Sequence, residues 1–152
     1  MPESWDTRLT RWASNWFPAY RGSGARIQYI ASDWLEVRIR LPLNWRTRNY
    51  VGTIFGGSMF SALDPIYMIM LIKALGAEYE VWDKSATIQF RRPGRSTLHA
   101  TFRLDSAELA AIRVEVQASG RSERRYAVEL VDGAGEVCAS CEKLITIRSR
   151  RE

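Results

Sequence analysis

One long apolar segment limits what this chain can fold into. Residues 50–72 contain a single charged side chain, Asp64. Apolar residues recur there at helical spacing, and Gly76 is typical of the residue that ends a helix. The length would suit a membrane span, but Gly56-Gly57 and Pro65 inside the segment argue against one. A helix that is apolar nearly all round must be enclosed by protein, so we expect the rest of the chain to wrap around it.

The flanking segments alternate apolar and polar residues, as half-buried strands do. We expect three hairpins, formed by residues 26–31 with 34–41, 86–90 with 98–104 around Pro93-Gly94, and 126–131 with 137–147 around residues 132–135. A short helix over residues 108–117, capped by Ser106 and ending near Gly120, interrupts them. This order predicts an α+β fold, a curved antiparallel sheet of about five to six strands wrapped around a long central helix.

Aromatic residues at intervals of three and four predict an amphipathic helix at the N-terminus. Trp5, Leu9, Trp12, Trp16 and Tyr20 would share one face of it. We expect this face to pack on the domain; a lid or a contact with a membrane surface is the alternative. The predicted organisation is an N-terminal helix over residues 1–22, one domain over residues 23–148 and a tail over residues 149–152.

Composition narrows the class of protein. The chain has 152 residues, of which 46% are hydrophobic and 26% charged, and this suits one folded, soluble domain. Its start lacks the basic and apolar runs of a secretory signal, so we expect a cytoplasmic protein with reduced cysteines. The net charge of +5 favours an anionic partner. We recognise no nucleic-acid-binding module and no strand aromatics arranged to stack bases, so we expect no nucleic-acid partner.

Cys138 and Cys141 form a C-x-x-C pair, a spacing found in zinc sites and redox pairs. A zinc site needs two more ligands, and His99 is the only histidine of the chain. A redox pair normally opens a helix, whereas this pair lies inside a predicted strand. We therefore expect two structural thiols on opposite faces of a strand, no metal site and a solvated His99.

Asp64 has the strongest claim to chemistry. An ionised carboxylate buried among apolar side chains is costly unless it is paired or used, and burial raises its pKa toward that of a general base. A structural Asp bonded to a strand or a second subunit is the alternative. Gly56 and Gly57 open the helix, where free N–H groups could hold an oxyanion. A tight turn from loop to helix explains the glycine pair equally well.

The stretch Asn49–Asp64 (NYVGTIFGGSMFSALD) resembles the signature of hotdog-fold acyl-CoA thioesterases of the phenylacetate-pathway type. Residues 82–84 and 90–95 resemble a thioesterase-like branch of that superfamily whose function is unknown. The resemblance implies that Asp64 is the base or nucleophile acting on a thioester. It also implies that the Gly56 N–H polarises the thioester carbonyl and that Asn49 orients water or substrate. In such families the site forms across a dimer interface, so we expect a homodimer or a dimer of dimers.

Two residues depart from the family pattern: Phe55 stands where a His is usual, and Pro65 directly follows the acid. We expect hydrolysis of an acyl-CoA or related thioester by water that Asp64 activates. A non-catalytic acyl- or lipid-binding protein is the alternative, and Phe55 keeps it open. Coenzyme A would be part of the substrate, with no separate cofactor. The substrate is expected to contact Phe55, Gly57, Met59 and Phe60, with Arg91, Arg92 and Arg95 binding its phosphates.

Overall fold

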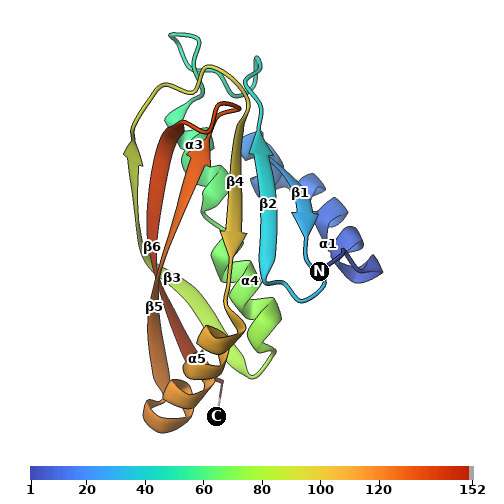
Figure 1. Cartoon of the computed structure of the whole chain (residues 1–152), viewed down its shortest axis with the longest axis vertical. Coiled ribbons are helices and arrows are strands. Elements are labelled where there is room, and N and C mark those ends of the chain that lie inside the picture. The colour runs from blue at the N-terminus through green and yellow to red at the C-terminus, as the bar shows by residue number, and fades with distance from the viewer. Residues whose placement is uncertain (151–152) are drawn as a thin grey trace.

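A six-stranded antiparallel sheet curves around two consecutive helices (Figure 1). The computed structural model describes residues 1–150. The strands lie in the spatial order β1-β2-β4-β5-β6-β3, so β1 and β3 are the edges. Their bounds are β1 Arg26–Ile30, β2 Glu36–Leu41, β3 Tyr79–Phe90, β4 Leu98–Arg103, β5 Arg121–Val131 and β6 Val137–Ser149. The predicted fold class is confirmed.

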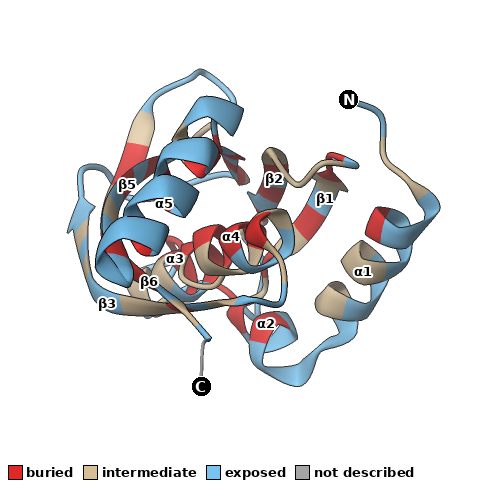
Figure 2. Ribbon diagram, turned by 90° about the horizontal axis from the view of Figure 1, so that it is seen from below, coloured by how far each residue is buried: buried red, intermediate tan, exposed pale blue. Residues whose placement is uncertain are grey.

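The predicted central helix is present as two helices, α3 (Gly56–Leu63) and α4 (Ile66–Leu75). They lie at the centre of the molecule with the sheet around them (Figure 2). Leu63, Met70 and Leu71 are fully buried there. By length and composition Gly56–Leu75 could cross a membrane, but half of it is buried inside the domain, as befits a core helix. Gly76 ends α4 with a φ of 103°, as expected from the sequence.

The first and last predicted hairpins are confirmed, because β1 pairs with β2 and β5 pairs with β6. The middle one is wrong. β3 pairs along its length with β6, whereas β4 pairs with β2 on the other side of the sheet. Residues 91–97 therefore cross between distant strands instead of making a turn. Backbone hydrogen bonds fix this crossing, from Ile54 N to Gly94 O (2.8 Å) and from Arg91 N to Cys138 O (2.8 Å).

The helix that interrupts the sheet is α5 (Ser106–Ser119), longer than predicted. Its N-cap is Asp105 and not Ser106, because the Asp105 carboxylate accepts from Ala107 N at 2.9 Å. Gly120 ends it with a φ of 80°, as predicted. The predicted tail starts within β6, which runs to Ser149, and its residues 151–152 lie outside the described part.

The N-terminal segment forms two helices, α1 (Trp5–Trp16) and α2 (Pro18–Ser23), which break at Phe17 because Pro18 starts the second. α1 lies against the edge strand β1 through its polar side. The Asn15 amide donates to Ile27 O (2.9 Å) and accepts from Ile27 N (2.7 Å). The predicted packing is wrong for Trp5, Leu9, Trp12 and Trp16, which are exposed, whereas Tyr20 of the same predicted face lies on α2 and is buried. Much of α1 is exposed to solvent (Figure 2).

Candidate functional site

Asp64 lies at the break between α3 and α4. The break follows from Pro65, which has no N–H to donate to the carbonyl of Ser61 and so cannot continue the helix. The Asp64 side chain is 45% exposed, so the expected deep burial of this carboxylate is wrong. Its position at a helix break leaves both the carboxylate and the backbone carbonyl of Asp64 available to other groups.

A buried lysine takes both of them. Lys143 on β6 is 0% exposed, and its Nζ lies 2.9 Å from Asp64 Oδ1 and 2.7 Å from Asp83 Oδ2. Nζ also donates to the backbone carbonyl of Asp64. That carbonyl lies at the C-terminal end of α3, where the helix dipole is negative and a cation is favourable. The lysine thus ties the break in the central helix to the carboxylate and to the sheet.

Asp83 on β3 completes this group of two carboxylates and one ammonium. Burial raises the pKa of Asp83, Lys143 lowers it and the neighbouring Asp64 raises it, with a net upward shift. Its Oδ1 is buried and has no hydrogen-bond partner within residues 1–150. One ammonium group cannot neutralise two ionised carboxylates. When Asp64 and Asp83 are both ionised, the cluster therefore carries one net negative charge.

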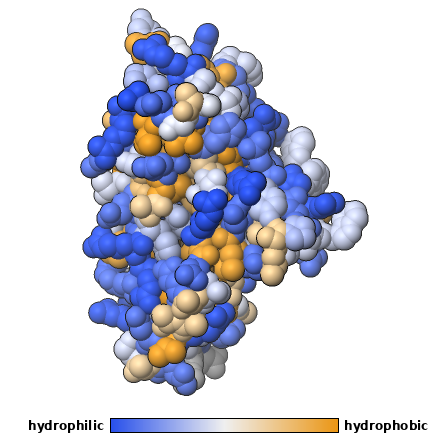
Figure 3. Space-filling model, viewed as in Figure 1, coloured by the Kyte–Doolittle hydropathy of each residue, from blue (hydrophilic) through white to orange (hydrophobic). Residues whose placement is uncertain are grey.

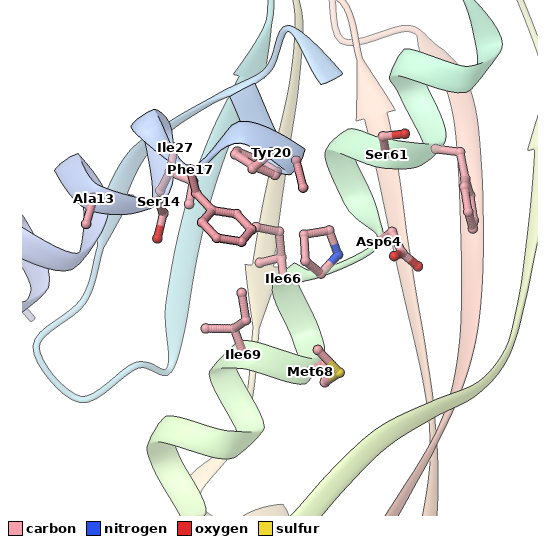
Figure 4. A pocket seen from close by; sticks show the side chains of 13 residues that line it. Ala13, Ser14, Phe17, Tyr20, Ile27, Ser61, Asp64, Ile66, Met68 and Ile69 are labelled. Carbon is pink, nitrogen blue, oxygen red and sulfur yellow. The ribbon is translucent and has the colours of Figure 1, made fainter. Parts of the chain in front are cut away.

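An apolar pocket of about 600 Å³ opens beside Asp64, between the N-terminal helices and the central ones (Figure 4). Phe17 and Tyr20 lie on one side, and Ile66 and Ile69 of α4 lie on the other. Among the lining residues, the polar side chains besides the Tyr20 hydroxyl are Ser14, Ser61 and Asp64. The Tyr20 hydroxyl itself donates to Ala62 O at 3.2 Å. Asp64 thus lines an apolar cavity of the size that small-molecule ligands occupy, and its carboxylate, bound to Lys143, points away from Phe17 and Tyr20 (Figure 4).

Asn49 and Gly56, the other predicted catalytic residues, lie away from Asp64 in the same chain. Neither residue is among the described residues that line the pocket. The Asn49 amide holds its own turn, accepting from Val51 N (3.1 Å) and Thr53 N (3.0 Å). Gly56 begins α3 and Asp64 follows its end, a separation of about 12 Å at the helical rise of ~1.5 Å per residue. One thioester carbonyl could not contact both.

The glycine pair is packed beneath two aromatic rings. A Cβ on Gly57 would lie 2.3 Å from the Phe55 ring, and one on Gly56 would lie 2.9 Å from the Phe90 ring. Both phenylalanines are exposed. Within residues 1–150 the start of α3 has no side-chain cap, so its first N–H groups have no side-chain acceptor. The glycines are required for this close approach of the rings.

The predicted acyl-binding residues divide between pocket and core. Phe60 lines the pocket, whereas Met59 is buried in the core. Met68, rather than Met59 or Met70, is the methionine at the pocket. The pocket also uses residues that the sequence did not indicate, in particular Ser61, one helical turn before Asp64, and Phe17.

The predicted phosphate-binding arginines lie on the crossing between β3 and β4. Arg92 pairs with Glu136 at 2.8 Å, and Arg91 Nε donates to Ser140 Oγ at 3.3 Å. All three arginines are exposed. Two further arginines lie on β5 and are also paired, Arg124 with Glu115 (2.8 Å) and Arg125 with Glu142 (3.2 Å). The exposed pairs of Arg92 and Arg125 are weak and exchange readily for other anions, whereas Arg124 is 19% exposed and binds both carboxylate oxygens of Glu115.

The cysteines and the histidine stand apart from this chemistry. Cys138 and Cys141 are free and buried, and burial raises the pKa of both thiols. His99 is exposed on β4, as expected. Within residues 1–150, no group of three or more His, Cys, Asp or Glu side chains is placed to hold a metal ion.

Lys143, like Asp83, is a site residue to which the sequence interpretation gave no role, although the sequence carries a signal for Lys143. Along β6 the buried positions Ala139, Cys141, Ile145 and Ile147 alternate with more exposed ones, and Lys143 falls in the same series. A lysine on the core side of a strand requires a carboxylate opposite it.

Comparison with known proteins assigns the family. Residues 6–147 match the family described as a domain of unknown function, DUF4442. The chain belongs to this family. No curated protein was found to match this DUF4442 chain.

Solved structures similar to the DUF4442 chain cover almost all of it. One is PA5026 from Pseudomonas aeruginosa, a protein of unknown function described as a probable thioesterase; the two chains are 26% identical over 99% of each, with a TM-score of 0.85. OLEI01261 from Chlorobaculum tepidum, of unknown function, is 15% identical over 95% of this chain and 94% of its own, with a TM-score of 0.75. The thioesterase HI1161 from Haemophilus influenzae is 14% identical over 99% and 95%, with a TM-score of 0.71. The predicted resemblance to the hotdog thioesterase-like fold is confirmed.

Proposed function

We propose that this DUF4442 protein hydrolyses thioesters of apolar acyl groups, with Asp64 as the general base. The observation that carries the proposal is the half-exposed Asp64 carboxylate at the end of an apolar pocket, held in place by the buried Lys143. The likeness to proteins described as thioesterases supports the same reaction class.

In this mechanism the acyl chain occupies the pocket and its thioester carbonyl lies near Asp64. Lys143 binds Oδ1, so Oδ2 takes the proton of a water molecule while the water oxygen attacks the carbonyl carbon. The carbon–sulfur bond then breaks, and the thiolate leaves with the proton that Asp64 returns. Lys143 keeps the carboxylate oriented, because it is fixed by Asp83 and by the end of α3.

We propose further that two copies complete the site. Within one chain the Gly56 N–H lies about 12 Å along the helix from Asp64, too far to polarise the same carbonyl. Gly56 and Asn49 would therefore come from the second subunit of a homodimer. β3 is an edge strand with unpaired backbone groups, and the exposed Phe55 and Phe90 lie beside the start of α3. These surfaces are suited to self-association.

Coenzyme A is the carrier that the charges favour. Arg91, Arg92 and Arg95 are exposed on the crossing after β3, and guanidinium groups bind phosphates well. The pair of Arg92 with Glu136 is exposed on both sides, so a phosphate could replace the carboxylate at little cost.

A second candidate function, acyl binding without hydrolysis, is favoured by one observation. The rings of Phe55 and Phe90 lie over the two glycines that would present the oxyanion-binding N–H groups. If the rings stay there, the acyl pocket remains while polarisation of the carbonyl is lost.

Thiol release from short, medium, long and aryl acyl-CoAs tests the proposal, with Asp64→Asn compared with wild type. We expect the variant to lose at least about 100-fold in kcat, as is usual when a general base is removed. Asp6→Asn is the matched control, because Asp6 is an exposed carboxylate on α1. Equal turnover by wild type and Asp64→Asn would exclude Asp64 as the base. Acyl-CoA binding without turnover on any substrate would establish the binding protein instead.

A further inference from the structure

The outward face of α1 holds a patch of large apolar side chains in solvent. Trp5, Trp12 and Trp16 are 85%, 62% and 56% exposed, and Leu9 and Phe17 are exposed with them. α1 projects at the right-hand edge of the molecule in the space-filling view (Figure 3). Single apolar residues are common on protein surfaces, but a group of this kind on one helix marks a contact surface.

Polar contacts on the opposite side of α1 fix this orientation. Asn15 makes two hydrogen bonds with the backbone of Ile27, and the Glu3 carboxylate accepts from Ile30 N (3.0 Å) while pairing with Arg11 (2.8 Å). Turning the helix to bury its tryptophans would break all of these bonds. The exposure of the apolar face is therefore specified by the structure.

The chemistry of this face fits a lipid surface. Tryptophan is the residue that concentrates at the boundary between headgroups and acyl chains, and amphipathic helices that lie there combine it with arginine. The Arg21 guanidinium lies 4.7 Å from the Trp16 ring centroid, and that of Arg8 lies 5.8 Å from Trp5. Both arginines are exposed at the rim of the patch, where phosphate headgroups would lie.

The charge balance of the segment favours anionic lipid. Of its two acids, Glu3 is turned inward and pairs with Arg11 (2.8 Å) and Arg8 (3.9 Å), which leaves Asp6 as the exposed carboxylate against the two exposed cations Arg8 and Arg21. The whole chain carries a net charge of +5, which adds attraction toward an anionic surface.

α1 also forms one wall of the apolar pocket. Ala13, Ser14 and Phe17 line the pocket from the side of α1 (Figure 4). They are neighbours in sequence of the exposed Trp12 and Trp16. Any surface that contacts the outward face of α1 is thus separated from the pocket only by this helix. An apolar ligand that leaves such a surface would be released next to the pocket.

We propose that α1 docks on the surface of a phospholipid bilayer containing anionic lipid, with Trp5, Trp12 and Trp16 inserted at the level of the headgroups. The docking does not depend on hydrolysis at Asp64. The helix lies in the plane of the surface, and its polar side keeps the bonds to β1 that hold the domain.

The test is cosedimentation of the full chain with vesicles of phosphatidylcholine alone and with added phosphatidylglycerol, together with the tryptophan emission maximum. We expect wild type to bind both, more strongly with phosphatidylglycerol, and its emission to shift to shorter wavelength. Replacing Trp5, Trp12 and Trp16 together by Ala should lower the partition coefficient at least about tenfold. Arg8→Glu should lower the preference for anionic vesicles. Trp45→Ala is the matched control, because Trp45 is 81% exposed in the loop before α3, and it should bind as wild type does.

Three results would overturn the proposal. In the first, wild type stays in solution with both kinds of vesicle. In the second, the triple variant binds as well as Trp45→Ala. In the third, neither protein binds vesicles, and the mass measured by light scattering is lower for the triple variant than for wild type. That outcome would assign the face to a contact between copies of the chain.

Discussion

The central helices and the N-terminal helix meet the sheet in opposite ways. α3 and α4 are apolar nearly all round and half buried against the sheet, and the charge cluster at Asp64 lies where the helix breaks. α1 is amphipathic, yet it turns its polar side to β1 and its tryptophans to solvent. Apolar periodicity therefore shows where a helix forms and which face is apolar. Specific polar contacts decide which face meets the domain.

The largest effect is expected from Lys143→Met. Lys143 is 0% exposed and is bonded to Asp64 and Asp83, so its removal leaves two facing carboxylates without their cation. Breaking a fully buried pair in this way costs about 3–5 kcal/mol. Because the side chains of Asp64 and Asp83 are 45% and 23% exposed, we expect a loss at the lower end, about 3 kcal/mol, in the free energy of unfolding from urea titration. Lys84→Met provides the control, because Lys84 pairs with Glu123 at an exposed position of β3. Its loss should be under about 1 kcal/mol. Equal stability of the two variants would show that the cluster is not essential to the core.

A smaller effect is expected from Asn15→Ala, which tests the other half of the comparison. The Ile27 N–H and carbonyl lose their partner, so α1 should loosen from β1 by about 1–3 kcal/mol. Hydrogen exchange at the Ile27 amide should accelerate accordingly, while exchange in α4 stays unchanged. Trp12→Ala, on the outward face of the same helix, should alter exchange at Ile27 by no more than about 0.5 kcal/mol. If Trp12→Ala loosened the helix more, apolar packing would be the force that holds it.

The same contrast explains what the sequence could predict. Several features follow from local patterns and are confirmed. They are the central helix, the hairpins β1–β2 and β5–β6, and the end of α4 at Gly76. The placement of β3 beside β6 does not, because alternation marks a strand but not its partner. The predicted middle hairpin failed for that reason.

The candidate site divides in a similar way. Asp64 stood out because a single charge lies in a long apolar run. Lys143 and Asp83 lie far from it in sequence and meet it only through the pairing of β3 with β6. The wall of the pocket formed by Phe17 depends on α1 lying polar side inward, which helical periodicity alone does not predict.

The smallest effect concerns the pH range in which α1 stays packed against β1. Burial alone would raise the pKa of Glu3, but hydrogen bonds from Arg11 and Ile30 N and the charges of Arg11 and Arg8 outweigh it and lower this pKa below its usual 4.5. A carboxyl group with a lowered pKa in the folded state stabilises that state fully above its unfolded pKa. The stabilisation is lost as the pH falls through the folded pKa.

We therefore expect α1 to remain packed against β1 at pH 5 and above, and to loosen from it only on acidification below the usual pKa of 4.5. The amide shift of Ile30, which donates to Glu3 Oε1, reports this directly in an NMR titration. In Glu3→Gln the titration step of Ile30 should disappear, because no proton is taken up there. A step in wild type with a midpoint above 4.5 would mean that burial, not the arginines, dominates at Glu3. Glu3 would then weaken the packing of α1 against β1, which Asn15 supports.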